Sequence, residues 1–200
     1  MRSPQEFMTE YLTDSTSTLQ AFATDRECRA IMARMAEAIG DALRAGGKLL
    51  IAGNGGSAGD AQHIAGEFLS RLMFDRAPLA AIALTTDTSV LTAAANDYGF
   101  DTVFERQILA LARPGDVFLA ISTSGCSRNV LLALDAARGR GVLTMGFCGS
   151  QTEAMGPRSD LLLAAPSGRT AIIQQIHIVA AHIVCALVEQ AMFPVPHLAV

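Results

Sequence analysis

The sequence lacks several features that define common protein classes. Only 17% of its 200 residues are charged, and 15 basic residues are outnumbered by 19 acidic ones. The net charge of −4 argues against nucleic acid or an anionic membrane as a partner. Half of the residues are hydrophobic, which is enough for a core and excludes extended disorder. So little charge also indicates that another subunit covers part of the surface.

Secretion and membrane signals are also missing. The 4 cysteines are widely spaced without a CxxC pair, as is typical of reduced thiols in the cytosol. Residues 1–12 carry charges and no apolar stretch of the signal-peptide type, so we expect a cytoplasmic protein. Glutamines and histidines interrupt the most apolar segment, residues 171–188, which favours a buried helix over a membrane span.

Apolar strands and helices alternate along most of the chain. We expect strands at 48–53, 80–84, 116–121, 141–147 and 160–164, and helices at 57–71, 86–95, 103–112, 127–138 and 170–192. This order predicts an α/β three-layer sandwich with a mostly parallel sheet. A helical arm, residues 1–46 with a break near Thr24-Asp25, precedes the main domain, residues 47–200. The whole chain is expected to be one structural domain.

A glycine-rich turn, Asn54-Gly55-Gly56-Ser57, follows the first expected strand. Glycines let backbone N–H groups approach an anion at the start of a helix, and Ser57 can cap that helix. The turn lacks the lysine of a P-loop and the GxGxxG spacing, so ATP and NAD are not expected. A tight turn without any ligand is the alternative interpretation.

A hydroxyl-rich turn follows the third expected strand and supplies Ser122, Thr123, Ser124 and Ser127. Neutral hydroxyls at a helix N-terminus can hold a phosphate without a basic residue. An ordinary helix cap with incidental serines is the alternative. Cys126 lies in the same turn but has no basic neighbour that would activate it as a nucleophile. The GxSxG elbow of serine hydrolases is absent.

His63 and Glu67 lie about 6 Å apart along one helical face, where they can bind a metal or act as an acid/base pair. Gln174 and His182 join them as candidates, but they are ~12 Å apart along one helix. We therefore expect a complete site to take residues from more than one subunit. Taken alone, His182 is typical of a core histidine, and His177 of a packing or interface residue.

These segments together resemble the phosphoheptose isomerases of the sugar-isomerase (SIS) family. The resemblance runs from about residue 45 to 190, through residues 53–58, 60–63, 83–87, 95–98, 113–117, 121–125 and 174–182. It implies a five-stranded parallel sheet of flavodoxin-like order and a homotetramer with active sites between subunits. It also implies isomerisation of D-sedoheptulose 7-phosphate to D-glycero-D-manno-heptose 7-phosphate, an early step toward the heptoses of surface lipopolysaccharide.

The resemblance also implies roles by position. The residues expected at the substrate are Asn54, Gly55, Gly56, Ser57, Glu67, Asn96, Asp97, Ser122, Thr123, Ser124, Ser127 and Gln174. The residues expected at one Zn²⁺ per subunit are His63, Glu67, Gln174 and His182. Glu67 and His182 are the expected acid/base pair of an enediol mechanism, in which zinc would polarise the carbonyl.

Three departures from the family pattern bear on function. Cys126 stands where asparagine is usual, and Ile172 stands where a charged residue is frequent. The tail Met192–His197 resembles that of SIS proteins that bind the bacterial replication initiator instead of converting a sugar. A non-enzymatic partner of that initiator is therefore the alternative function. The presence of both Glu67 and His182 favours the isomerase.

Overall fold

Five parallel strands form the centre of the protein. The computed structural model describes residues 2–193, and within them the sheet has the order β2-β1-β3-β4-β5. The strands are Leu49–Gly53 (β1), Ala81–Ala83 (β2), Val117–Ser122 (β3), Leu143–Cys148 (β4) and Leu161–Ala164 (β5). Each lies within 2 residues of its predicted place. The α/β prediction and the flavodoxin-like strand order are confirmed.

Seven α-helices accompany the sheet in the described residues. They are Pro4–Thr24 (α1), Arg26–Arg44 (α2), Gly56–Leu69 (α3), Thr88–Tyr98 (α4), Val103–Leu111 (α5), Arg128–Gly139 (α6) and Thr170–Met192 (α7). The break between α1 and α2 falls where it was predicted. Asp25 takes an extended conformation there, and its carboxylate accepts hydrogen bonds from the N–H groups of Glu27 and Cys28.

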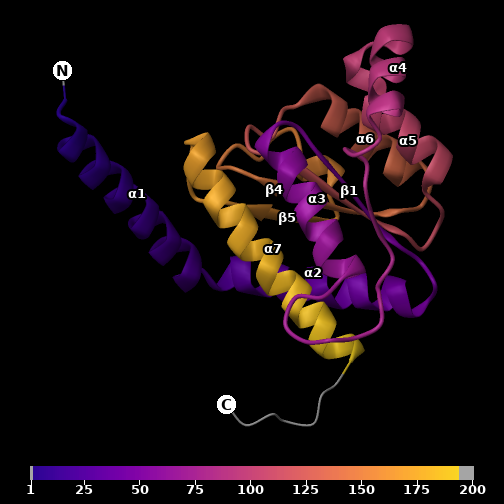
Figure 1. Cartoon of the computed structure of the whole chain (residues 1–200), viewed down its shortest axis with the longest axis horizontal. Helices are drawn as coiled ribbons and strands as arrows, with labels where there is room; N and C mark the ends of the chain where they lie inside the picture. Colours follow the sequence, from indigo (N-terminus) through magenta and orange to yellow (C-terminus); the bar gives the residue numbers. More distant parts are fainter. Residues whose placement is uncertain (1, 194–200) are drawn as a thin grey trace.

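Helices cover both faces of the sheet, as Figure 1 shows. One hydrophobic core joins α2, α3 and α7 to one face, and a second joins α4, α5 and α6 to the other. Because strands β1 and β3 are buried on both faces, every one of their residues is buried. Helix α2 packs into the first core, while the predicted boundary at residue 46 stays a prediction.

Helix α7 is the one helix among residues 2–193 whose length and composition would suffice to cross a membrane. Half of its most apolar stretch is nevertheless buried inside the protein. It packs along α2 and α3, as the core helix that the sequence predicted.

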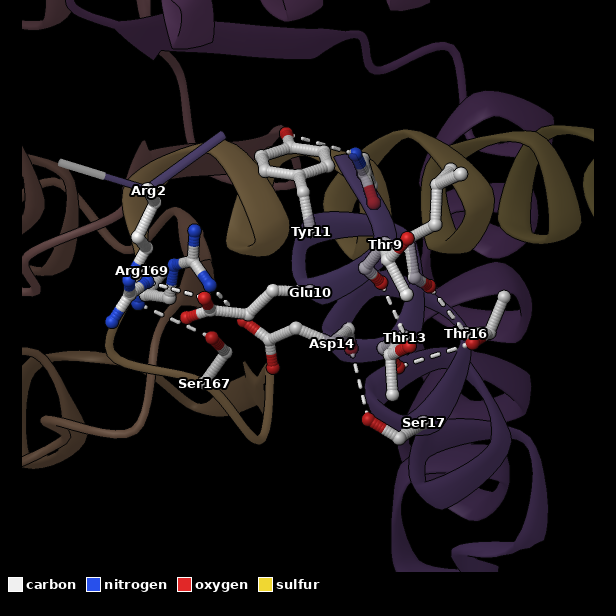
Figure 2. A network of polar contacts seen from close by, with 12 residues as sticks. Arg2, Thr9, Glu10, Tyr11, Thr13, Asp14, Thr16, Ser17, Ser167 and Arg169 are labelled. Carbon is white, nitrogen blue, oxygen red and sulfur yellow. Dashed lines mark hydrogen bonds and ion pairs between the residues drawn. The ribbon is translucent and has the colours of Figure 1, made fainter. Parts of the chain in front are cut away.

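Helix α1 extends away from the rest of the molecule (Figure 1). Only Thr18 and Phe22 of this helix are buried. Polar contacts hold it to the start of α7 (Figure 2): Arg169 pairs with Asp14 at 2.5 Å, and Gln175 donates to the Tyr11 hydroxyl at 3.3 Å. Several large apolar side chains of α1 remain exposed: Phe7, Met8, Leu12 and Leu19.

The sheet places the two predicted loops next to each other. β1 and β3 are neighbours, with Gly53 opposite Ile121, so the glycine and serine loops leave the sheet side by side. β2 lies on one side of β1 and β3 on the other, so the strand order reverses direction at β1. Open α/β sheets bind ligands in such a crevice, beyond the carboxyl ends of their strands.

Candidate active site

His63, Glu67 and His182 meet at one place on the surface of a single chain. Their ligand atoms all lie within 4.8 Å of one another. The Nε2 atoms of His63 and His182 are 2.8 Å apart, and His63 Nε2 lies 3.2 Å from Glu67 Oε1. One imidazole nitrogen must donate and the other accept at that distance. His63 is exposed, whereas Glu67 and His182 are half-buried.

Two helices position these side chains. His63 and Glu67 are one turn apart on α3, so they share a face. His182 comes from α7, which packs against α3 and presents the imidazole to that face. The reading of His182 as a core histidine is therefore wrong. His177 does pack in the core, where it is almost completely buried.

The three residues suit a zinc ion. Imidazole nitrogen and carboxylate oxygen are zinc ligands, and tetrahedral ligands about 2.1 Å from the metal lie roughly 3.4 Å apart. The separations of 2.8 and 3.2 Å are already close to that value. With three protein ligands, a fourth position stays open for substrate, as in catalytic zinc sites.

Gln174 does not join this cluster within one chain. Its amide lies against Gly56, at the start of α3, so closely that a Cβ on Gly56 would overlap it. Gly56 precedes His63 by seven residues, which is ~10 Å along the helix. The structure thus brings together three of the four predicted metal ligands and places the fourth beside the glycine loop.

The glycine loop leaves the start of α3 open. Gly55 is the N-cap, no side chain caps the helix, and its first turn contains no acidic residue. The expectation that Ser57 caps α3 is wrong, because Ser57 lies inside the first turn and is buried. Asn54 is held in a reciprocal amide pair with Asn129 of α6, through hydrogen bonds of 2.8 and 2.9 Å.

The serine loop forms a compact hydroxyl cluster at the start of α6. Ser122 donates to Ser127 at 2.9 Å, and the Ser122 and Ser124 hydroxyls are 3.4 Å apart. Ser127 is the N-cap of α6 but makes no capping side-chain bond, and the first turn contains no acidic residue. The carbonyl of Thr123 accepts from the Gly149 N–H, which ties the loop to the end of β4.

The open starts of α3 and α6 make this crevice attractive to anions. An α-helix carries partial positive charge at its N-terminus, where the first N–H groups have no partner within the helix. Helices α2 and α4, by contrast, are capped by Asp25 and Asp87. Two uncapped helix starts joined by the Asn54–Asn129 pair are therefore suited to a phosphate group.

Comparison with known proteins identifies the family of the chain. The sequence profile of the SIS domain matches residues 10–149. The phosphoheptose isomerase of Roseiflexus sp. (strain RS-1) is 48% identical over 195 residues, 96% of this chain and 99% of that protein. The phosphoheptose isomerase of Bradyrhizobium sp. (strain ORS 278) is 52% identical over 185 residues, 92% and 93% of the two chains. The chain belongs to the phosphoheptose isomerase family.

Solved structures of this family have the same fold. Phosphoheptose isomerase GmhA from Neisseria gonorrhoeae superposes with a TM-score of 0.87 at 40% identity, over 94% of this chain and 100% of the other. A phosphoheptose isomerase from Francisella tularensis gives a TM-score of 0.90 at 32% identity, with the same coverage. Membership of this family makes the chain an isomerase.

The predicted sugar-binding residues Asn96 and Asp97 belong to α4, whereas the cluster comes from α3 and α7. They stand exposed at the end of α4, where the Asn96 amide donates to Asp97 at 2.7 Å. Asp97 also lines a cavity of about 570 Å³ between α4 and α5. Among residues 2–193, neither side chain makes a hydrogen bond with the serine loop or with the His63, Glu67 and His182 cluster.

Sequence reasoning missed two polar residues of this phosphoheptose isomerase fold. Asn129 connects the two loops, but an isolated asparagine in a helix start gives no distinctive signal. Asp60 lies one turn before His63 on α3, and its Oδ2 is buried without a partner among the described residues. Burial raises the pKa of Asp60, and the nearby His63 partly opposes that increase.

Proposed function

We propose that the chain converts D-sedoheptulose 7-phosphate to D-glycero-D-manno-heptose 7-phosphate. The observation that carries this proposal is the meeting of Glu67 and His182, from two helices, in a fold whose β1 and β3 lead at neighbouring positions into the uncapped starts of α3 and α6. Family membership supports the sugar-phosphate substrate. We place the reaction in the cytoplasm, where phosphorylated sugars are made.

Proton transfer in this proposal falls to the acid/base pair. Glu67 removes the proton from the carbon next to the carbonyl of the open-chain sugar, and an enediol results. His182 donates to and accepts from the sugar oxygens, and the proton returns to the neighbouring carbon. Oε1 of Glu67 faces His63, which leaves Oε2 available as the proton acceptor. Both residues are half-buried, so the reacting atoms are partly shielded from water.

Substrate binding is assigned to the two loops. Ser122, Ser124 and Ser127 offer hydroxyls to the phosphate, with Thr123, while the helix starts supply N–H groups and positive potential. Asn54, Gly55, Gly56 and Ser57 line the sugar from the neighbouring strand. Hydroxyl and backbone N–H donors can bind a phosphate without a lysine or arginine side chain in the site.

A zinc ion would be held by His63, Glu67 and one ring nitrogen of His182, which would leave the other ring nitrogen of His182 for proton transfer. When bound, it supplies a Lewis acid that polarises the sugar carbonyl and stabilises enediolate charge. The convergence of three suitable ligand atoms supports this assignment. Gln174 stays a proposed ligand or substrate contact, because in one chain its amide lies at the glycine loop.

We also propose a homotetramer with active sites between subunits. Support comes from an apolar groove of about 320 Å³ between α1, α2 and α7, which is lined by Leu19, Phe22, Met32, Ile183 and Leu187 among others. Among residues 2–193, the exposed Asn96 and Asp97 make no hydrogen bond to the other proposed site residues, and a neighbouring subunit would supply those partners.

The alternative, a non-enzymatic partner of the replication initiator, is not favoured. Curated relatives at 44% to 52% identity are named phosphoheptose isomerases. Most of the tail that suggested the alternative, residues 194–197, lies outside the described residues.

Activity on the proposed substrate tests the assignment directly. Purified protein is incubated with sedoheptulose 7-phosphate and the aldose product is detected. Glu67→Gln and His182→Ala should fold normally and each lose at least ~100-fold in kcat, as expected for loss of a general acid or base. Glu37→Gln, which changes an exposed glutamate on α2, is the matched control and should keep full activity. An inert wild-type protein, or active Glu67→Gln, would contradict the proposal.

A further inference from the structure

Arg76 and Glu189 form a buried ion pair that the proposed mechanism does not use. Arg76 Nε lies 3.0 Å from Glu189 Oε1, and the two side chains are only 3% and 1% exposed. Burying two charges is costly unless all their hydrogen-bonding groups find partners. The pair joins the end of α3, which carries Glu67, to α7, which carries His182.

Arg76 caps the C-terminus of α3, the helix that carries His63 and Glu67. Its guanidinium donates to three backbone carbonyls at the end of α3, those of Glu67 at 2.6 Å, Phe68 at 2.7 Å and Ser70 at 3.0 Å. A fourth bond, of 3.1 Å, goes to the carbonyl of Ala77. The last carbonyls of a helix have no partner within it, and they carry partial negative charge. A buried cation therefore satisfies the final turn at the residue that supplies the carboxylate.

Glu189 fixes that cation to α7. It lies seven residues, or two turns and ~10 Å, beyond His182 on the same helix. Its carboxylate also accepts the N–H groups of Leu72 at 3.1 Å and Met73 at 2.7 Å. Phe193 lies over the guanidinium, with its ring centre 5.8 Å from Arg76 Cζ.

The segment between α3 and β2 depends on the same contacts. Residues 70–80, all of them described, contain neither helix nor strand, and they pass close to the C-terminal end of α7 (Figure 1). The ion pair thus joins the end of α3, this irregular segment and α7. Without it, the last turn of α3 would be free to fray, and Glu67 lies in that turn.

We propose that Arg76 and Glu189 are positioning residues, which set the distance between Glu67 on α3 and His182 on α7. This inference rests on the proposed function, in which Glu67 and His182 transfer the proton. Neither Arg76 nor Glu189 touches substrate. The pair acts through the backbone of Glu67 and through the spacing of the two helices.

A matched pair of double variants separates positioning from plain stabilisation. Arg76→Met with Glu189→Gln removes both charges and keeps one oxygen acceptor, enough for one of the two N–H groups of Leu72 and Met73. Lys48→Met with Asp116→Asn makes the same change at the amino ends of the strands, where Lys48 Nζ lies 2.6 Å from Asp116 and that carboxylate also accepts two backbone N–H groups. In the control pair Asp116 is buried and Lys48 is half-buried. Of the two pairs, the hydrogen bonds among the described residues tie the first to α3.

Four quantities are measured for each variant: the melting temperature, kcat, KM for sedoheptulose 7-phosphate, and the affinity for Co²⁺ from its visible absorption. For the Arg76/Glu189 variant we expect kcat and Co²⁺ affinity each to fall about 10-fold or more, as for other residues that orient ligands, with KM little changed. The Lys48/Asp116 variant should melt earlier but keep kcat and Co²⁺ affinity within about twofold, since distant sites act independently.

Equal losses in both double variants, or unchanged kcat and Co²⁺ affinity in the first, would overturn the proposal. Should the first double variant not fold, Arg76→Lys decides by the same measurements, because lysine keeps the charge but cannot bridge three carbonyls and Glu189 together. If the wild-type protein does not convert the substrate, the proposed function fails. The Co²⁺ comparison then still tests whether the pair positions the cluster.

Discussion

Two histidines on α7 show how neighbouring residues of one type take opposite roles. His182 faces α3, while His177 lies in the core and donates its Nε2–H to the Cys148 carbonyl at 3.0 Å. The Nδ1 of His177 has no partner among the described residues. Burial lowers the pKa of His177 to about 4, and the hydrogen bond to Cys148 only partly opposes this.

This histidine predicts a loss of stability in acid. In the unfolded chain His177 is protonated below pH ~6.5, whereas in the folded chain it is protonated only below about pH 4. Between these values the unfolded state binds the additional proton, so the free energy of unfolding falls as the pH falls. Between about pH 7.5 and pH 5 the loss should be about 2 kcal/mol greater in the wild type than in His177→Gln. Urea unfolding at the two pH values measures the difference. Parallel losses in both proteins would contradict the prediction.

At the residue scale, the sequence predicted contacts within one helix better than contacts between helices. His63 and Glu67 are four residues apart, and helical geometry alone puts them on one face. The approach of His182 depends on how α7 packs against α3, which no local pattern encodes. The same holds for Arg76 and Glu189, 113 residues apart in sequence.

Element boundaries followed from periodicity and turn residues. The predicted bounds of α7 agree with the structure, and the strands differ by at most 2 residues. Capping was less predictable. Ser57 has the right residue type for an N-cap, but Gly55, with a φ of 56°, starts the helix two residues earlier. Its positive φ lets the chain leave β1 and turn at once into α3.

The open start of α6 predicts a conflict between stability and binding. Ser127→Asp should cap α6 and stabilise the protein by ~1 kcal/mol, since aspartate is a strong N-cap. The same carboxylate would repel a phosphate, so KM for sedoheptulose 7-phosphate should rise about 10-fold or more. Thermal melting and steady-state kinetics measure the two effects. Ser3→Asp, at the already capped start of α1, is the control and should leave KM unchanged. A normal KM in Ser127→Asp would exclude the serine loop as the phosphate site.

The whole molecule shows an uneven distribution of exposed apolar side chains. Leu19 and Leu187 are about 40% exposed and line the groove between α1, α2 and α7. Helix α1 gains little burial within its own chain. An amphipathic helix that projects from a protein is stabilised when a second copy covers its apolar side.

This surface predicts that assembly and activity are lost together. Leu19→Asp combined with Leu187→Asp should reduce the proposed tetramer to smaller species by light scattering, because charged groups are costly in an apolar interface. If the sites lie between subunits, activity should fall in proportion to the loss of tetramer. Leu109→Asp, an exposed position on α5, is the control and should stay tetrameric. A fully active wild-type monomer would contradict both the assembly and the shared sites.

The sequence by itself determined the alternation of strands and helices, the two loops at the ends of β1 and β3, and the pairing of His63 with Glu67. Each of these depends on residues close together in the chain, where backbone geometry fixes the spacing. Only the tertiary structure decided how His182, which the resemblance had implied, reaches His63 and Glu67, that Gln174 stays at the glycine loop, and that Arg76 and Glu189 join α3 to α7. Those contacts depend on how whole helices pack on the sheet, which is set by the summed fit of many side chains.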